Sequence, residues 1–335
     1  MSNYYDLIAD GGVAPEVDSY STIQAAMNNA ASQRKTLLVP QYRFYSSQKL
    51  YIPSNLRIQG TGPRSAIWPI ANIVLFEANT VDNWAIDGLQ SEGFCAPNYE
   101  NYYPDIPNNG QGFLRVLTCE DFSVSNLNLR RFAGIALSQE GGYLNEKKGI
   151  YQNIRGKECY TLLRCHNYGE YCEFFGVVGD RCTISLDVDS GNDAFFGCQG
   201  VNCRTGLKLT GGINHAHGQF NGCTFNHNNW NLEADDVEFG ESLSGCHFIG
   251  GTLIHPTIVT GRIRLTNSRG INFNGGIMGS NITVDGGAGT KNGQNSMNGM
   301  HVFNYTDTVA PSITNGGLLS RKGNTQETSM WAYNN

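Results

Sequence analysis

Three short segments of the chain repeat the pattern Gly-x-x-Phe at nearly constant spacing. They read GCTF at 222–225, GCHF at 245–248 and GINF at 270–273, so the stretches between their glycines are almost equal in length. Self-similarity at a period of roughly 20–50 residues is typical of solenoids, in which each repeat packs against its neighbours. The 335 residues also exceed the roughly 250–300 at which one globular core stops growing. The repeat therefore predicts an elongated stack of coils.

Apolar residues between positions 184 and 232 predict short strands within each coil. Leu186, Leu209 and Leu232 recur at equal steps and are assigned to the interior. Helical repeats are excluded because the helical period and the signature residues are lacking. Crossover chirality favours a right-handed coil, so the fold prediction is an all-β, right-handed parallel β-helix. Since side chains alternate along a strand, the outer face is predicted to carry Ser185, Asp187, Lys208, Thr210, Asn231 and Glu233.

The glycines and phenylalanines of the repeat have separate predicted roles. The glycines turn the chain between strands, because glycine adopts turn conformations without a steric penalty. The phenylalanines stack above one another inside the coils and bury a continuous core that no single coil could form. The glycines are Gly222, Gly245 and Gly270, and the phenylalanines are Phe225, Phe248 and Phe273.

Residues 21–33 are predicted to form a short helix that covers the open N-terminal end of the stack. Ser21 and Gln24 have the spacing of a capping box. Ile23, Ala26, Met27 and Ala30 fall on one helical face. Strands are expected at 37–39 and 56–58, where short apolar runs are bounded by Pro, Asn and Gly.

The order of these N-terminal features resembles the opening of the pectate-lyase-like parallel β-helix superfamily. Its members begin with an Asp-Gly segment, a capping helix, a strand ending in Pro and a first rung containing two glycines. The matching residues, in order, are Asp10, Gly11, Gly12, Ile23, Gln24, Ala25, Ala26, Val39, Pro40, Tyr42, Gly60 and Gly62, whereas Gln41 stands where glycine is usual. Across 113–285 the resemblance rests on the looser rung pattern, and it ends near residue 286.

This resemblance implies a polysaccharide as the ligand. Openings of this style are common among bacteriophage tailspikes, which are homotrimers that bind, and often cleave, host surface glycans. The implied partners are a bacterial capsular or O-antigen polysaccharide, two further copies of the chain and other virion tail proteins. The implied location is the virion tail.

The chain is predicted to form a single solenoid with three parts. Residues 1–62 hold the N-terminal cap and first rungs, 63–285 form the body, and 286–335 form a C-terminal excursion and cap. Two stretches rich in Asn and Gly interrupt the rungs: 92–112 is predicted to be an extruded loop, and 286–300 a surface excursion. One or two strands are expected after residue 300.

Composition excludes several classes of partner. With 41 glycines, 16% charged residues and 40% hydrophobic residues, the chain reads as ordered and rich in turns. The formal net charge of −6 offers no basic stripe, so a nucleic-acid partner is not expected. No run approaches the roughly 20 apolar residues of a membrane span, and MSNYYDLIADGG lacks the regions of a signal peptide. Synthesis in a cytoplasm, without membrane insertion, is the expectation.

Ten cysteines raise the question of disulfides or a metal site, but none forms a C-x-x-C pair. Cys172, Cys198, Cys223 and Cys246 recur at intervals close to that of the repeat itself. This spacing predicts one interior column of small apolar side chains, with disulfides as the alternative. No metal or other cofactor is expected.

Two segments place acidic residues on equivalent strands two coils apart. SLDVDSGND at 185–193 and NLEADD at 231–236 give Asp187 with Glu233 as the first candidate catalytic pair, and Asp189 with Asp235 as the second. Coils stack about 4.8 Å apart, so each pair should lie roughly 10 Å apart, which suits an inverting glycosidase better than a retaining one. The alternative is that these acids solvate an exposed face and cap turns.

Further polar and aromatic residues are candidates for substrate binding. Sugars are held by aromatic faces and polar groups. The alternative for the histidines is a structural or solvent role, and the alternative for the tyrosines is packing between subunits. Trp230 shares the phase of interior residues and is interpreted as core. The candidate substrate-binding residues are Tyr99, Tyr102, Tyr103, Lys208, His215 and His217.

Three functions therefore remain open. The first is a virion polysaccharide-binding protein that acts as an endo-hydrolase, and the second is a non-catalytic adhesion or structural protein of the virion. The third is a polysaccharide lyase or epimerase, which requires cations to neutralise a uronate carboxylate. The candidate cations are Arg204, Lys208, Arg262 and Arg264.

Overall fold

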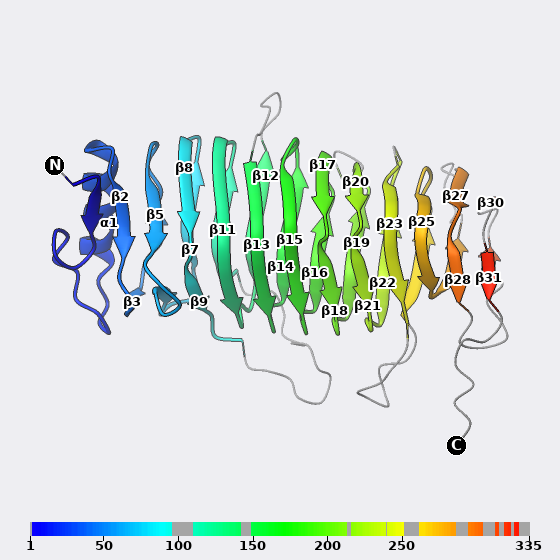
Figure 1. Cartoon of the computed structure of the whole chain (residues 1–335), viewed down its shortest axis with the longest axis horizontal. Helices are drawn as coiled ribbons and strands as arrows, with labels where there is room; N and C mark the ends of the chain where they lie inside the picture. The colour runs from blue at the N-terminus through cyan, green and yellow to red at the C-terminus, as the bar shows by residue number, and fades with distance from the viewer. Residues whose placement is uncertain are drawn as a thin grey trace, which may run out of the picture.

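The computed structural model describes residues 2–95, 110–141, 149–212, 216–238, 240–250, 261–285, 294–303, 312–314, 318–322 and 325–327. Over these ranges the chain is a parallel β-solenoid, in which each coil pairs with the next through two sheets (Figure 1). The prediction of a parallel β-helix is confirmed. Among the described residues, no helix is both long and apolar enough to cross a membrane.

Within the described ranges, the smaller sheet contains eleven strands, one from each coil that it crosses. Its strands are β4 (Leu50–Tyr51), β7 (Val74–Asn79), β10 (Gly112–Leu117), β12 (Ile135–Gly141), β14 (Thr161–Asn167), β16 (Ile184–Val188), β19 (Thr205–Thr210), β22 (Trp230–Asp235), β24 (Arg262–Thr266), β26 (Asn281–Asp285) and β29 (Ser312–Thr314).

In the part of the chain that the structure describes, the larger sheet contains twenty strands, because several coils cross it as two shorter strands. β11 pairs with β8 through its first half and with β9 through its second half. The strands are β1 (Tyr4–Asp6), β2 (Thr36–Val39), β3 (Arg43–Ser46), β5 (Arg57–Gly60), β6 (Ala66–Pro69), β8 (Asp82–Asp87), β9 (Gln90–Glu92), β11 (Glu120–Arg130), β13 (Gly149–Lys157), β15 (Glu173–Asp180), β17 (Gly191–Phe196), β18 (Gln199–Val201), β20 (His217–Asn221), β21 (Thr224–Asn226), β23 (Ser242–Ile249), β25 (Asn272–Gly279), β27 (Gln294–Asn298), β28 (His301–Phe303), β30 (Leu318–Lys322) and β31 (Thr325–Glu327).

The bend between the two halves of the larger sheet requires a left-handed backbone conformation. Gly222 and Gly245 have φ of 60° and 62° there, and Asn126 and Asn153 fill the same position in earlier coils with φ of 54° and 51°. Asn153 Nδ2 donates to Asn126 Oδ1 at 2.7 Å, which links these two coils. Glycine and asparagine are the residues that adopt this conformation most readily, so the predicted turning role is confirmed at the bend for Gly222 and Gly245. Gly270, with φ of 78°, lies before β25 instead, and Gly275 occupies the bend of that coil.

Aromatic rings stack along the interior through successive coils. Phe195 is sandwiched between Phe174 and Phe220, with ring centroids 4.5 and 4.4 Å away. The repeat phenylalanines form part of a second column, in which Phe225 lies 5.6 Å from Phe248. The first column is made of Tyr151, Phe174, Phe195 and Phe220. Trp84 stacks on Phe122 at a neighbouring position, and Phe122 meets Tyr151 edge-on at 5.6 Å.

The prediction for the third repeat phenylalanine was wrong in register. Phe273 pairs with Leu243, whereas Phe248 pairs with Met278, so Phe273 belongs to the neighbouring column. Its ring meets Phe248 edge-on at 5.5 Å. The physical reason is that the coils differ in length, so equal sequence spacing does not guarantee equal position.

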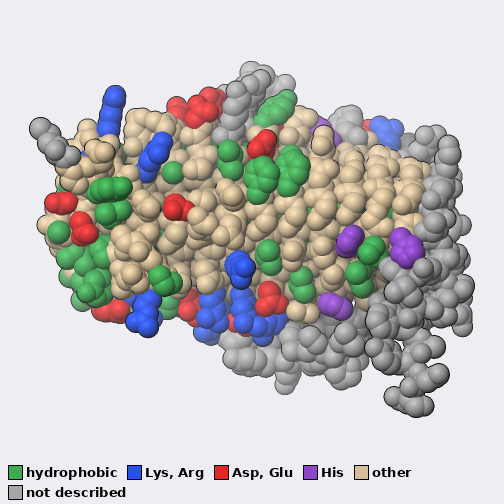
Figure 2. Space-filling view, in the orientation of Figure 1, with side chains coloured by type: hydrophobic (Ala, Val, Ile, Leu, Met, Phe, Trp, Pro, Cys, Tyr) green, Lys and Arg blue, Asp and Glu red, His purple; other side chains and the backbone are tan. Residues whose placement is uncertain are grey.

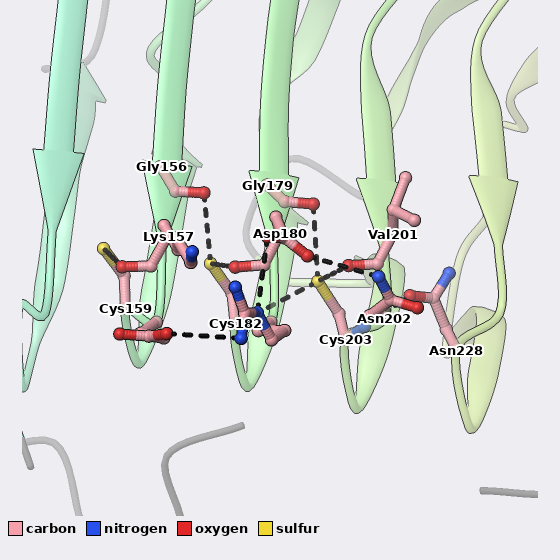
Figure 3. A network of polar contacts seen from close by, with 12 residues as sticks. Gly156, Lys157, Cys159, Gly179, Asp180, Cys182, Val201, Asn202, Cys203 and Asn228 are labelled. Carbon is pink, nitrogen blue, oxygen red and sulfur yellow. Dashed lines mark hydrogen bonds and ion pairs between the residues drawn. The ribbon is translucent and has the colours of Figure 1, made fainter. Parts of the chain in front are cut away.

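All ten cysteines are buried and free of disulfide bonds. Cys198, Cys223 and Cys246 occupy aligned positions in successive coils, as predicted, but Cys172 does not share their column, because it aligns with Asp193. A second column that the sequence analysis missed is drawn in Figure 3 and contains Cys159, Cys182 and Cys203. The thiols of Cys182 and Cys203 donate to the carbonyl groups of the preceding coil, at 3.9 and 3.6 Å.

The helix α1 (Tyr20–Ser32) lies at the N-terminal end of the solenoid (Figure 1). Its predicted apolar face is buried, including Ile23 and Met27. The predicted capping box is wrong, because the helix begins one residue earlier and its N-cap, Ser19, makes no side-chain cap bond. Gln24 instead exchanges two hydrogen bonds with the backbone of Tyr51, at 2.7 and 2.9 Å, and so joins the helix to β4.

The register of β16, β19 and β22 differs from the predicted one in the middle coil. Leu186 aligns with Leu207 and then with Leu232, so Leu207 takes the place that the equal steps assigned to Leu209. Ser185 and Asn231, predicted to be outside, are fully buried. Both make hydrogen bonds near the bends of the coil: Ser185 Oγ donates to the Gln199 carbonyl at 3.1 Å, and Asn231 bonds to Asn228.

The solenoid continues beyond residue 285. The predicted surface excursion at 286–300 is wrong for its second half, because β27 pairs in parallel with β25. Within the described residues after 300, β28, β29, β30 and β31 extend both sheets, more than the one or two strands expected.

Candidate functional site

The outer face of the 11-stranded sheet carries a row of alternating charges. The row crosses β7, β10, β12, β14, β16, β19, β22 and β24, and each side chain pairs with the residue directly above or below it in the stack. Neighbouring strands lie about 4.8 Å apart, so long charged side chains in adjacent coils meet. In order along the stack, the row contains Glu77, Arg115, Ser138, Arg164, Asp187, Lys208, Glu233 and Arg264.

Asp187 lies between two cations in this row. Arg164 Nε is 3.8 Å from Asp187 Oδ2, and Lys208 Nζ is 3.8 Å from Oδ1. The residue is only 9% exposed. Burial raises the pKa of the Asp187 carboxyl and Asp189 adds to this, although Lys208 and Arg164 oppose the shift. Asp187 therefore keeps its proton to a higher pH than an ordinary aspartate.

A second row on the same face places Asp189 beside a histidine. Asp189 accepts a hydrogen bond from the backbone N–H of Asn167 at 2.7 Å and contacts Nδ1 of His166. The two aspartates on this part of the chain therefore have different surroundings: Asp187 is buried beside cations it does not touch closely, whereas Asp189 is directly hydrogen-bonded. The row contains Glu140, His166, Asp189, Thr210, Asp235 and Thr266.

Glu233 is held firmly in place. Thr205 Oγ1 donates to Glu233 Oε2 at 2.7 Å, and Arg264 Nη2 donates to Oε1 at 2.6 Å. The guanidinium groups of Arg262 and Arg264 lie 4.4 and 4.7 Å from the ring centroid of Trp230. The interpretation of Trp230 as a core residue is therefore wrong, because its ring is half-buried beneath two arginines.

The first candidate pair is aligned as predicted. Asp187 and Glu233 occupy the same position two coils apart, with Lys208 between them. The two members of the second candidate pair differ in exposure: Asp189 is buried, whereas Asp235 is exposed. Lys208 occupies the position between the first pair along the row, and its Nζ lies 3.8 Å from Asp187 Oδ1.

The remaining candidates do not join this group within the described residues. His217 lies on β20 of the larger sheet, where it pairs with Gly191. Tyr99, Tyr102, Tyr103 and His215 lie outside the described residues.

Sequence reasoning missed Arg164 and His166. Both lie in TLLRCHN at 161–167, whose alternation of Leu163 and Cys165 with polar residues marks the outer face of a strand. That signal was present, but only the pairing of Arg164 with Asp187 shows that it belongs to the acidic group.

The described part of the chain contains no group of three or more His, Cys, Asp or Glu side chains arranged to hold a metal ion.

Comparison with known proteins gives fold neighbours only. No protein-family model and no curated protein sequence matches the chain. Among solved structures, the A-module of the mannuronan C-5 epimerase AlgE6 from Azotobacter vinelandii is similar with a TM-score of 0.62 at 11% identity, covering 97% of this chain and 100% of that one. The tailspike of Acinetobacter baumannii bacteriophage Fri1, a capsular polysaccharide depolymerase, has a TM-score of 0.65 at 10% identity, covering 97% and 64%.

A second tailspike, from Escherichia coli bacteriophage HK620, gives a TM-score of 0.58 at 13% identity, covering 94% of this chain and 64% of that one. The protein shares the fold of the pectate-lyase-like parallel β-helix proteins. The resemblance read from the N-terminal residues is thus confirmed for the architecture. This chain spans a little under two thirds of the length of the two tailspikes.

Proposed function

We propose that this protein is a tailspike-like virion protein that binds a bacterial capsular or O-antigen polysaccharide and hydrolyses it on the outer face of the 11-stranded sheet. The observation that carries the proposal is Asp187, a nine-tenths buried carboxyl with a raised pKa that lies between Arg164 and Lys208 on the outer face. A carboxyl group that keeps its proton to a higher pH than an ordinary aspartate is the kind of group that a glycosidase uses to protonate its leaving group.

In the proposed reaction Asp187 donates its proton to the glycosidic oxygen as the bond to the anomeric carbon breaks. Glu233 accepts a proton from the water whose oxygen attacks that carbon from the opposite side. Two strand spacings place the backbones of these residues roughly 10 Å apart, close to the roughly 6.5–9.5 Å between carboxyl groups of inverting enzymes. Thr205 and Arg264 orient Glu233 for this role.

The cations beside Asp187 are suited to holding the glycan. Their nitrogen atoms lie 3.8 Å from the carboxylate oxygens, which is beyond hydrogen-bond length. The side chains of Arg164 and Lys208 are 33% and 38% exposed. A hydroxyl or carboxylate of a bound sugar can therefore attract either cation without breaking a close ion pair.

A lyase or epimerase reaction is the second candidate, and Arg164 favours it. With Lys208, Arg164 places two cations around one buried acid, an arrangement that can neutralise a uronate carboxylate while a base removes the neighbouring proton. Similarity in fold to a mannuronan C-5 epimerase supports keeping this candidate.

The test is to incubate purified protein with a panel of capsular and O-antigen polysaccharides and to measure new reducing ends, unsaturated uronates and epimerised residues. Hydrolysis predicts new reducing ends without unsaturation, lost on Asp187→Asn and on Glu233→Gln. Glu77→Gln is the matched control, because Glu77 is a buried, ion-paired acid in the same row but four coils away. Binding without any product would instead indicate a non-catalytic adhesion protein.

The virion assembly is proposed from the fold neighbours. A homotrimer should sediment at three times the chain mass of 36.7 kDa. A chain that stays monomeric at all concentrations would contradict the trimer. The polysaccharide panel tests glycan binding and cleavage separately.

A further inference from the structure

The larger sheet carries a hollow that the candidate site does not use. It has a volume of about 510 Å³ and is bordered by side chains from five successive coils of the N-terminal half. Because it lies on the 20-stranded sheet, it is separate from the charged rows of the 11-stranded sheet. The residues that decide its chemistry are Arg57, Asp121, Ser123, Ile150, Tyr171 and Glu173.

The hollow exists because short side chains are aligned in the middle of one row. Arg57, Ala85, Ser123, Ile150 and Glu173 occupy the same outer position in successive coils. The short side chains of Ala85 and Ser123 form the floor of the hollow, while the longer side chains of the row lie at its two ends. The distance from the Arg57 coil to the Ile150 coil is three strand spacings, or about 14 Å. A short stretch of an extended polymer can lie along this floor.

One wall is apolar and unusually exposed. Ile150 is 43% exposed and Tyr171 is 48% exposed. In Figure 2 hydrophobic side chains gather over β13, β15 and β17, beside an acidic side chain. Phe175 and Phe196 continue this surface with rings stacked 5.0 Å apart. An exposed aromatic ring next to polar groups is the surface that stacks against the apolar face of a sugar ring.

Tyr171 has a left-handed backbone conformation, which is unfavourable for a tyrosine. Its φ is 61°, and the equivalent turn positions in other coils carry Asn83, Asp121 and Asn192, with φ of 54°, 47° and 55°. Among the described non-glycine residues with positive φ, Tyr171 is the only tyrosine, phenylalanine or tryptophan. A bulky residue in this conformation stores strain, and such strain is concentrated at binding sites.

The charged side chains around the hollow are available to a ligand. Within the described residues, Arg57, Asp121 and Glu173 form no ion pair or side-chain hydrogen bond. On the 11-stranded sheet, by contrast, Glu233 and Glu140 each bind an arginine at 2.6 and 2.8 Å. Carboxylates accept hydrogen bonds from sugar hydroxyls, and a guanidinium donates to hydroxyl or carboxylate oxygens.

We propose that this hollow is a second glycan-binding site, which holds a short hydroxyl-rich segment of the polysaccharide against Tyr171 and Ile150. The inference rests on the proposed function in its choice of ligand class but not on cleavage. A sugar ring lies against the aromatic wall, its hydroxyls bond to Asp121 and Glu173, and Arg57 binds the far end of the segment. The site retains the polymer whether or not the other face cuts it.

The test uses the full chain carrying Asp187→Asn, so that the glycan is not consumed, and measures binding on an array of bacterial capsular and O-antigen polysaccharides. In that background Tyr171→Asn removes the ring but suits the left-handed backbone, so it should fold with an unchanged or higher melting temperature. We expect it to weaken binding at least about tenfold, the loss typical of a residue that dominates an interface. Ser123→Leu, which fills the floor, should do the same.

Two controls separate stacking from general damage. Tyr171→Phe keeps the ring and should retain binding, and so should Tyr42→Ala, which removes a tyrosine of similar exposure elsewhere on the molecule. Unchanged binding by both Tyr171→Asn and Ser123→Leu, together with loss on Lys208→Met, would overturn the second site while the proposed function survives. If the starting protein binds no polysaccharide on the array, both proposals fail.

Discussion

The carboxyl groups of Asp193 and Glu241 are buried in coils on either side of Gly218. Both residues are almost fully buried, and a Cβ placed on Gly218 would lie 3.4 Å from Glu241 Oε2 and 2.7 Å from the Asp193 carbonyl oxygen. Asp193 accepts hydrogen bonds from Ser190 Oγ at 2.5 Å and from the Cys172 backbone at 2.9 Å. Burial raises the pKa of Asp193 to about 8 and raises the pKa of Glu241 well above its ordinary value.

These two acids predict that stability depends on pH in the direction opposite to that of a salt-bridged carboxylate. An unfolded Asp193 loses its proton near pH 4, whereas the folded one keeps it to about pH 8, so folding binds a proton between these values. Between pH 4 and 8 the free energy of unfolding should therefore fall by up to about 1.4 kcal/mol per pH unit from this residue. Urea unfolding of wild type and Asp193→Asn across that range tests this. If the free energy of unfolding changed with pH in the same way in wild type and in Asp193→Asn, the prediction would be contradicted.

Gly218→Ala should destabilise the protein by about 1–3 kcal/mol, because the added methyl group overlaps a backbone carbonyl and crowds Glu241. The change in melting temperature measures the effect. Gly218→Ala combined with Glu241→Ala relieves only the contact with the carboxylate. A full recovery in the double variant would show that the carbonyl contact costs nothing.

Lys208→Met should shift the alkaline limb of the cleavage profile to higher pH. Lys208 is the strongest of the charges that oppose the raised pKa of Asp187, so its removal allows Asp187 to keep its proton longer. The measurement is the rate of reducing-end formation against pH on a polysaccharide that wild type cleaves. A shift to lower pH would exclude Asp187 as the proton donor.

Phe195→Ala should cost about 3–5 kcal/mol of unfolding free energy, because it leaves a cavity between two stacked rings. The neighbouring residue supplies the comparison: Phe196 points outwards and is 36% exposed, so Phe196→Ala should cost far less. The denaturant midpoints of Phe195→Ala and Phe196→Ala measure this difference in stability. Equal losses would mean that the interior stack does not carry the stability assigned to it.

The fold could be predicted because a solenoid repeats its signals. Gly222 and Gly245 mark the bend of two successive coils, and Ile23 with Met27 marks the buried face of the helix. Register was harder, because the coils vary in length. Trp84 stacks on Phe122 although the sequence between them is nearly twice as long as that between Phe174 and Phe195, which also stack. A fixed period cannot find such a column.

The candidate site was only partly predictable for the same reason. Asp187 and Glu233 could be aligned from the alternation of their own strands, but Arg164, the cation that the preceding coil supplies to Asp187, emerges only from the pairing. The hollow on the larger sheet has no sequence signal at all, since its floor combines Ala85 and Ser123, whose separation along the chain far exceeds the length of the repeat.

The buried cysteines determine in which redox environments the protein can remain folded. Since the structure holds together without a covalent cross-link among its ten thiols, reducing agents have no disulfide to break and oxidants find no exposed thiol to attack. The same fold should therefore survive a change from a reducing to an oxidising compartment. Its architecture does not depend on the redox state of its surroundings.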